Sequence, residues 1–205
     1  MPPRDPEAIQ ALVDTYFEHG YQVRSMLRTL FLSDHFRSDA VRFVQVKSPV
    51  ELVVGTMRLA RALEWPTLDV RDATLSSFYM GQQLLGPPSV EGWHEGDEWV
   101  DSGALVERVN FAAKYLGDVR QPGVRDIVDS LGALDGGVLS PEQAVDGCLD
   151  MLGPVAVEDE TRRALVAHVA EDGDVNLRGE ASKDASRRVA EVLGLIASTR
   201  EYQLA

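Results

Sequence analysis

The chain has 205 residues, of which 44% are hydrophobic and 26% are charged, an ordinary globular composition that excludes a disordered chain. Acidic residues outnumber basic ones by 33 to 20, so the formal net charge is -13, and nucleic acids and anionic membrane surfaces are not expected as partners. Cys148 is the single cysteine, which excludes an intramolecular disulfide and favours a buried small hydrophobic side chain over a reactive thiol.

The first segment predicts a helical hairpin. Asp5-Pro6 combines an N-cap acceptor with proline at the first helical position, a typical helix start. Apolar residues then recur at helical spacing as far as Gly20, and a second helical stripe follows from Val23 to Phe31. Two adjacent stripes of this kind indicate two helices that pack side by side.

Two further helix starts are marked by capping boxes. In Ser48-Pro49 and Ser140-Pro141, the serine is followed three residues later by Glu51 or Gln143, whose side chain can reach back to the N–H of the cap. The first of these helices is expected to end at Trp65-Pro66, because proline cannot continue it.

The middle of the chain predicts a helix over residues 70–85 that buries Leu75, Phe78, Tyr79 and Leu84. An irregular stretch over residues 86–102 follows and contains Trp93, His94 and Trp99. The next helix carries an apolar face from Leu105 to Leu116 and is expected to stop at Gly117.

Shorter helical stripes occupy the rest of the chain, and sustained alternation of period two is absent. We therefore expect an all-α fold, an irregular array of about seven to nine helices with one long Trp/Gly-rich loop. A single domain over 1–205 is expected, with a candidate lobe boundary near residues 117–123. That boundary would separate a helical lobe (1–117) from a more acidic helical lobe (118–205).

Three groups of segments carry a family resemblance: residues 31–36 (FLSDHF) with 46–52, residues 80–82 with 87–93, and Trp99 with residues 108–112. In order and spacing they resemble the C-terminal half of the bacterial proteins grouped as domain of unknown function 1800. The closing stretch 195–203 is similar to the usual ending of that family. The resemblance covers the chain from about Phe31 to its end.

This resemblance implies little about chemistry, because the role of the family is unassigned. Its longer members look like exported proteins, often encoded beside a sulfatase-like partner, which implies an exported or periplasmic parent protein. The usual N-terminal half is not recognisable here, so we expect a truncated product or a separately encoded C-terminal piece. The chain as written shows no export signal and no membrane-length apolar run, so cytoplasmic location and no membrane insertion are expected for it.

No catalytic motif is recognisable. The loop residues His94, Glu95, Asp97 and Glu98 could bind a divalent cation, but a solvated acidic loop is the commoner structure. A calcium loop that starts at Asp172 fails, because Leu177 replaces the glycine and Lys183 replaces the glutamate that such a loop requires. Neither a metal site nor a cofactor is therefore predicted, and no residue is assigned a catalytic role.

The best place to look for a ligand is the long loop with nearby polar residues: Gln82, Trp93, His94, Trp99, Arg108 and Asn110. Paired tryptophans on an acidic loop can stack sugar rings, although tryptophans more often belong to the core. Arg108 and Asn110 are more readily explained as hydrogen-bond donors to loop carbonyl groups. We take Trp93 as the anchor that holds the loop on the protein.

Two functions remain open at the level of sequence. The leading hypothesis is a non-catalytic helical binding or accessory module, whose partner would be another exported protein or a glycan. The alternative is the C-terminal part of a hydrolytic or glycan-modifying enzyme whose active site needs the missing N-terminal half. The oligomeric state is left open.

Overall fold

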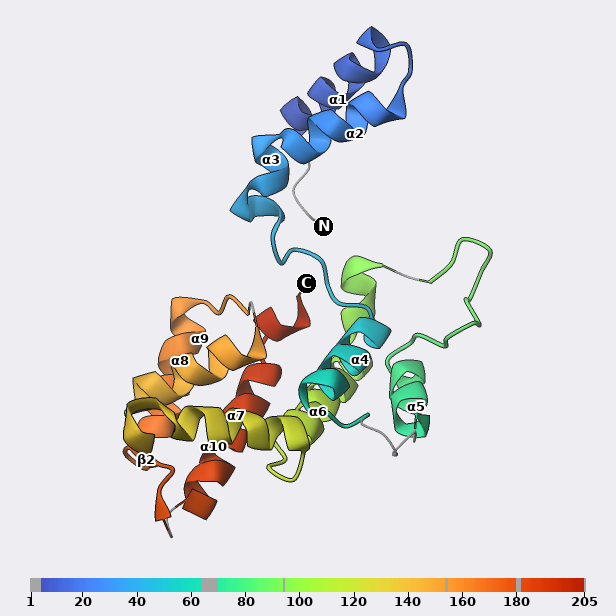
Figure 1. Cartoon of the computed structure of the whole chain (residues 1–205). Helices are drawn as coiled ribbons and strands as arrows, with labels where there is room; N and C mark the ends of the chain where they lie inside the picture. Colours follow the sequence, from blue (N-terminus) through green and yellow to red (C-terminus); the bar gives the residue numbers. More distant parts are fainter. Residues whose placement is uncertain (1–4, 64–69, 94, 154, 180–181, 205) are drawn as a thin grey trace. The chain divides into compact units, whose positions relative to one another are not determined.

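The structure is a computed structural model and describes residues 5–63, 70–93, 95–153, 155–179 and 182–204. Within these ranges the chain forms ten α-helices and two strands of two residues each (Figure 1). The all-α prediction is confirmed. The helix count exceeds the expected range because α3 (Asp34–Arg37) is a single turn, too short to show apolar periodicity in the sequence.

The chain divides into two compact units, one from Met1 to Val46 and the other from Lys47 to Leu204. The lobe boundary near residues 117–123 stays a prediction; buried side chains from both sides of it, such as Leu116 and Val124, belong to one hydrophobic cluster.

The first unit is the predicted helical hairpin, made of α1 (Pro6–Glu18) and α2 (Val23–Leu32), with α3 after it. The Asp5 carboxylate accepts hydrogen bonds from the backbone N–H groups of Glu7 and Ala8, as expected for the N-cap. Gly20, at a φ of 62°, provides the left-handed turn that ends α1. The hydroxyl groups of Thr15 and Thr29 lie 3.2 Å apart across the hairpin.

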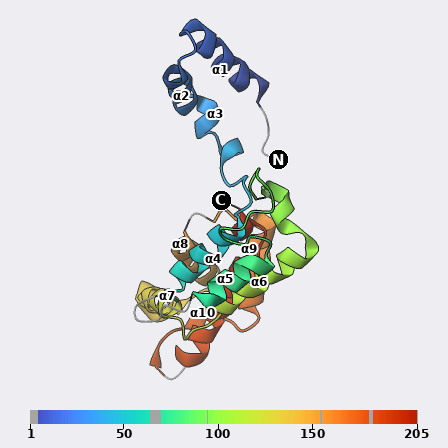
Figure 2. The ribbon, with the colours of Figure 1, turned by 90° about the vertical axis from the view of Figure 1, so that its right-hand side faces the viewer.

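The second unit contains the other seven helices (Figures 1 and 2). These are α4 (Pro49–Leu59), α5 (Arg71–Tyr79), α6 (Ser102–Leu116), α7 (Pro122–Gly132), α8 (Pro141–Leu152), α9 (Asp159–Ala170) and α10 (Ser182–Ala197). Strands β1 (Val138–Leu139) and β2 (Val175–Asn176) pair antiparallel, with Val138 opposite Asn176 and Leu139 opposite Val175. Short 3-10 helices include η2 (Gly96–Val100) and η5 (Glu201–Gln203).

Both capping boxes are present. The Ser48 hydroxyl accepts from the N–H of Glu51 at 3.4 Å, and Glu51 accepts from the N–H of Ser48 at 2.7 Å. At Ser140 the corresponding distances to Gln143 are 3.3 and 2.9 Å. The α4 helix ends at Leu59, earlier than expected, and Trp65-Pro66, the expected stop, lies outside the described residues.

Helix α10 is the centre of the core of the second unit. It contacts α6, α7, α8 and α9, and Leu193 and Ile196 are completely buried on it. Gly194 allows a close approach to α6, since a Cβ at that position would lie 3.3 Å from the Cα of Gly117. Cys148 is buried in the same core, as the sequence indicated.

The expectation for α5 is wrong in two respects. The helix ends at Tyr79 instead of Leu85, because Gly81, at a φ of 98°, turns the chain away. The four side chains expected to be buried are exposed, namely Leu75, Phe78, Tyr79 and Leu84. Only one side of α5 packs on the unit, and Ser77 and Met80 occupy that side.

Candidate functional site

Arg108 is a cationic side chain enclosed by the protein. It lies on α6 between Ala104 and Ala112, on the helix face that enters the core, and its exposed fraction is 0%. The Arg108 Nε donates to Gln203 Oε1 at 2.9 Å, and Nη2 donates to the carbonyl oxygen of Lys47 at 2.7 Å. Its Nη1 is buried and has no hydrogen-bond partner within the described ranges.

Lys47 is the second cation at this place. Its Nζ donates to the carbonyl oxygen of Tyr202 at 2.7 Å and lies 4.5 Å from the centroid of the Tyr202 ring. Its backbone N–H donates to the carbonyl oxygen of Gln203 at 2.8 Å. Lys47, two residues before α4, therefore binds the C-terminal segment through both its side chain and its backbone.

The C-terminal segment is held in turn by the core. The hydroxyl groups of Tyr202 and Thr56 lie 2.9 Å apart, and the pair is buried. The Gln203 Nε2 donates to the carbonyl oxygen of Ala197 at 3.4 Å, so the side-chain amide links Arg108 to the end of α10. We use the name Arg108 cluster for the four residues Lys47, Arg108, Tyr202 and Gln203.

Desolvation dominates the electrostatics of this cluster. Burial lowers the pKa of Arg108 to about 10, and the negative charge of Glu51 opposes that change. Burial also lowers the pKa of Lys47, the positive charge of Arg108 lowers it further, and Glu51 again opposes the change. Within the described ranges, neither cation has a carboxylate at ion-pair distance. Their hydrogen bonds go to uncharged oxygen atoms instead.

Gln82 has a structural role at the start of α4. Its Oε1 accepts a hydrogen bond from the backbone N–H of Val50 at 2.9 Å. This N–H belongs to the first turn of α4 and lacks a partner within the helix. Glu51, Gln82 and Arg108 come from segments that carry the family resemblance, and all three act near the first turn of α4.

The long loop is held by two tryptophans in different ways. Trp99, on η2, is buried with an exposed fraction of 4%, and its ring lies close to Gly81. Trp93 is only half-buried, and its Nε1 donates to the carbonyl oxygen of Gln83 at 3.2 Å. Trp99 is therefore the deeper anchor of the two, whereas Trp93 was expected to have that role.

Asn110 is not joined to this site. Asn110 is exposed on α6, because two residues along a helix correspond to about 200° of rotation away from Arg108. His94 lies outside the described residues. Binding of a ligand by the six predicted residues stays a prediction.

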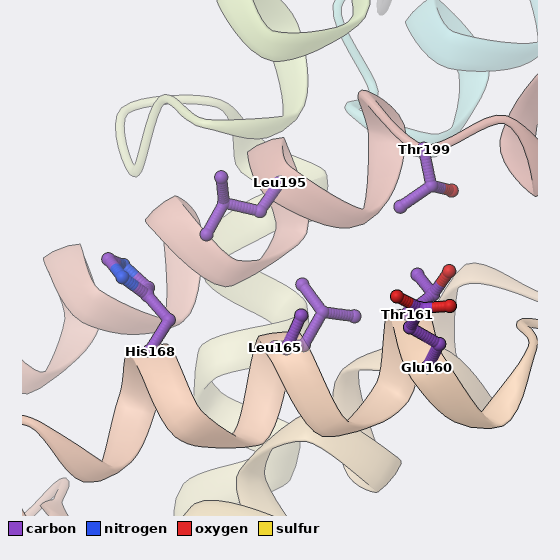
Figure 3. A pocket seen from close by; sticks show the side chains of 7 residues that line it. Glu160, Thr161, Leu165, His168, Leu195 and Thr199 are labelled. Carbon is purple, nitrogen blue, oxygen red and sulfur yellow. The ribbon is translucent and has the colours of Figure 1, made fainter.

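A hollow of about 530 Å³ lies elsewhere in the unit, between α9 and α10. Figure 3 shows Leu165 and Leu195 facing each other across it, with His168 at one end and Glu160, Thr161 and Thr199 at the other. The His168 Nε2 lies 3.1 Å from Glu191 Oε1. Sequence analysis missed this hollow because its residues come from two helices and form no local motif.

The described part of the chain gives little support for a metal site or a reactive thiol. No group of three or more His, Cys, Asp or Glu side chains there could hold a metal ion. Burial raises the pKa of the Cys148 thiol to about 12, so it is a poor nucleophile at neutral pH. Glu201 accepts from the N–H of Glu158 at 3.0 Å and from the Thr161 hydroxyl at 2.9 Å, so it caps α9.

No helix in the described part is both long and apolar enough to cross a lipid bilayer.

Comparison with known proteins places the chain in a family. No curated protein and no solved structure matches the chain. The profile of the family described as "Protein of unknown function (DUF1800)" matches residues 1–204, a span that begins well before Phe31. The chain therefore belongs to the DUF1800 family.

Proposed function

We propose that this chain is a helical binding or accessory module that recognises another polypeptide, and that it performs no chemistry by itself. The partner would be another exported protein, in keeping with the resemblance to exported bacterial proteins. A single observation carries the proposal: large apolar side chains on α5 and on the loop that follows it are exposed.

The exposed surface belongs to one continuous stretch of chain. Phe78 and Tyr79 end α5, and their rings lie 5.7 Å apart in an edge-to-face arrangement. Leu84, Leu85 and Val90 follow in the loop, and the last two are almost fully exposed. Exposed aromatic and aliphatic side chains that occur together are typical of protein interaction sites.

Gln82 and Arg108 have structural contacts in the second unit. Gln82 bonds to the backbone of α4, and Arg108 bonds to Gln203 and to the backbone of Lys47. Gln82 lies between Tyr79 and Leu84 in the sequence, so its hydrogen bond to Val50 fixes the chain within the exposed stretch. A chain segment that is held in one conformation loses less entropy when it binds a partner.

The test uses the whole chain and two matched variants. Phe78→Ser with Leu85→Ser should abolish binding to the partner encoded beside longer family members, measured by isothermal titration calorimetry. Leu134→Ser with Met151→Ser, which changes exposed apolar side chains elsewhere in the unit, should leave binding unchanged. Equal binding by both double variants would contradict the proposal.

A second candidate function is the C-terminal part of a hydrolytic or glycan-modifying enzyme. The Arg108 cluster favours it, because Arg108 and Lys47 are desolvated cations with lowered pKa values, and such groups cluster at active sites. A glycan ligand is supported by Trp93, whose half-buried ring could stack on a sugar. Hydrolase assays on this chain and on a full-length relative separate the two functions: activity in the isolated chain refutes the binding proposal.

A further inference from the structure

The helical hairpin over residues 5–45 has no buried side chain among its described residues. A unit of this size cannot bury enough apolar surface to be stable by itself. Isolated helices of 10 to 13 residues, the lengths of α2 and α1, are also marginal in water. The hairpin therefore requires something that covers its apolar surface.

Six of the exposed apolar side chains form two ridges with the same spacing. On α1 the exposed residues are Ile9, Val13 and Phe17, and on α2 they are Val23, Leu27 and Phe31. In each set the residues are four apart and therefore lie along one side of the helix.

Both ridges lie on the same face of the hairpin. Val13 follows the half-buried Leu12 by one residue, and Leu27 follows the half-buried Met26 by one residue. One residue corresponds to a rotation of about 100° around the helix axis. Because α1 and α2 run in opposite directions (Figure 1), an equal rotation away from the side on which the two helices contact each other turns both ridges to the same face of the hairpin.

The two helices carry opposite charges next to these ridges. On α1, Asp14 and Glu18 each follow a ridge residue by one position, and α1 contains no basic residue. On α2, Arg24 and Arg28 each follow a ridge residue by one position, and α2 contains no acidic residue. In the described part of the chain, Arg24, Arg28 and Glu18 have no ion-pair partner.

We propose that this face binds the same face of a second copy of the chain, and that two hairpins form an antiparallel four-helix bundle. A two-fold axis parallel to the helices places the acidic α1 of one copy against the basic α2 of its partner. A two-fold axis perpendicular to the helices would instead place α1 against α1 and α2 against α2, with like charges facing each other. Charge complementarity therefore favours a second copy of the chain as the partner, related by the axis parallel to the helices.

The available surface is close in size to one side of a specific dimer interface. The six ridge side chains are each about half exposed and offer roughly 100 Å² apiece. Together with Tyr21, whose ring lies 5.6 Å from that of Phe17, the face approaches the ~800 Å² per partner of a standard interface. Packing of this kind is typical of four-helix bundles. This inference does not depend on the proposed function, which concerns the second unit.

The charge pattern provides a sharp test with two complementary variants of the full chain. Asp14→Lys with Glu18→Lys makes both helices basic, and Arg24→Glu with Arg28→Glu makes both acidic. Sedimentation equilibrium should show a dimer for the natural chain and, for each variant alone, dissociation increased by on the order of tenfold or more. An equimolar mixture of the two variants should restore association as a heterodimer, measured by native mass spectrometry.

Control variants separate the interface from general effects of charge and folding. Arg125→Glu with Arg163→Glu reverses two exposed charges in the second unit and should leave the dimer unchanged. Phe17→Ser with Leu27→Ser should dissociate the dimer, whereas Val106→Ser, at an equally exposed site on α6, should not. Circular dichroism of each variant at a concentration where it is monomeric checks that the helices of the second unit are intact.

Three outcomes overturn the inference. The first is a natural chain that remains monomeric from low to high micromolar concentration. The second is a dimer that neither the charge variants nor the ridge variants weaken, since its interface would then lie elsewhere. The third is a mixture of the two charge variants that does not associate, which would indicate that the hairpin is covered by another polypeptide or by its own chain.

Discussion

Replacing Gln203 with leucine tests whether the Arg108 cluster holds the second unit together. Gln203 supplies the acceptor for Arg108 Nε at 2.9 Å, and Arg108 Nη1 already lacks a partner in the described part of the chain. Leucine would leave a second buried N–H of the same cation without a partner. We therefore expect Gln203→Leu to lower the free energy of unfolding by about 3 kcal/mol.

The magnitude follows from the environment of the guanidinium group. A hydrogen bond to a charged group is worth about 1.5–3 kcal/mol, and an unsatisfied buried donor adds the cost of its desolvation. The lowered pKa of Arg108, about 10, shows that the charge is already poorly solvated. For a unit of this size, a loss of about 3 kcal/mol corresponds to a melting temperature lower by roughly 6–12 °C.

Thermal and urea unfolding followed by circular dichroism measure the effect, with Gln83→Leu as the control because Gln83 is an exposed glutamine. Gln203→Glu provides a second comparison, since it keeps the acceptor and adds a charge opposite to that of Arg108. The pKa of the new carboxyl group should be lowered in the folded state. Its stabilisation should be present at neutral pH and lost as the pH falls through that lowered pKa. Unchanged stability in Gln203→Leu would refute the structural role of the cluster.

Three further predictions concern other parts of the second unit. Ser48→Ala should cost about 1 kcal/mol in urea unfolding, because α4 loses the acceptor for the N–H of Glu51; no change would show that the capping box contributes nothing. Trp99→Ala should cost roughly 3–5 kcal/mol and Trp93→Ala clearly less, because only Trp99 is buried; equal losses would contradict this ranking. The Cys148 thiol should react with a thiol reagent only after unfolding. Its pKa rises from 9.0 to about 12 on folding. The contribution of the buried thiol to the free energy of unfolding is therefore complete below pH 9.0 and is lost as the pH rises toward about 12. Rapid modification of the folded protein would refute the burial of this thiol.

The start points of the helices could be predicted from the sequence because the signals that set them are local. The Ser48 and Ser140 capping boxes each involve residues three positions apart, and the Asp5 cap reaches only to Glu7 and Ala8. Helical spacing of apolar residues also identified the hairpin. Burial was harder to predict, because a stripe on α5 has the same appearance whether or not another element covers it.

The Arg108 cluster depends on contacts that no local pattern contains. Sequence analysis named Arg108 as a candidate ligand residue and, more readily, as a hydrogen-bond donor to loop carbonyl groups, but it did not identify its partners. Its two partners lie 61 and 95 residues away along the chain, and its complete burial follows from the way α6 packs against α10 and the C-terminal segment. The sequence by itself determined where the helices begin and which residue types they carry, because those interactions act within one helical turn. Only the tertiary structure decided that Arg108 is a buried link between the start of α4 and the end of the chain, because that role depends on distant segments meeting in space.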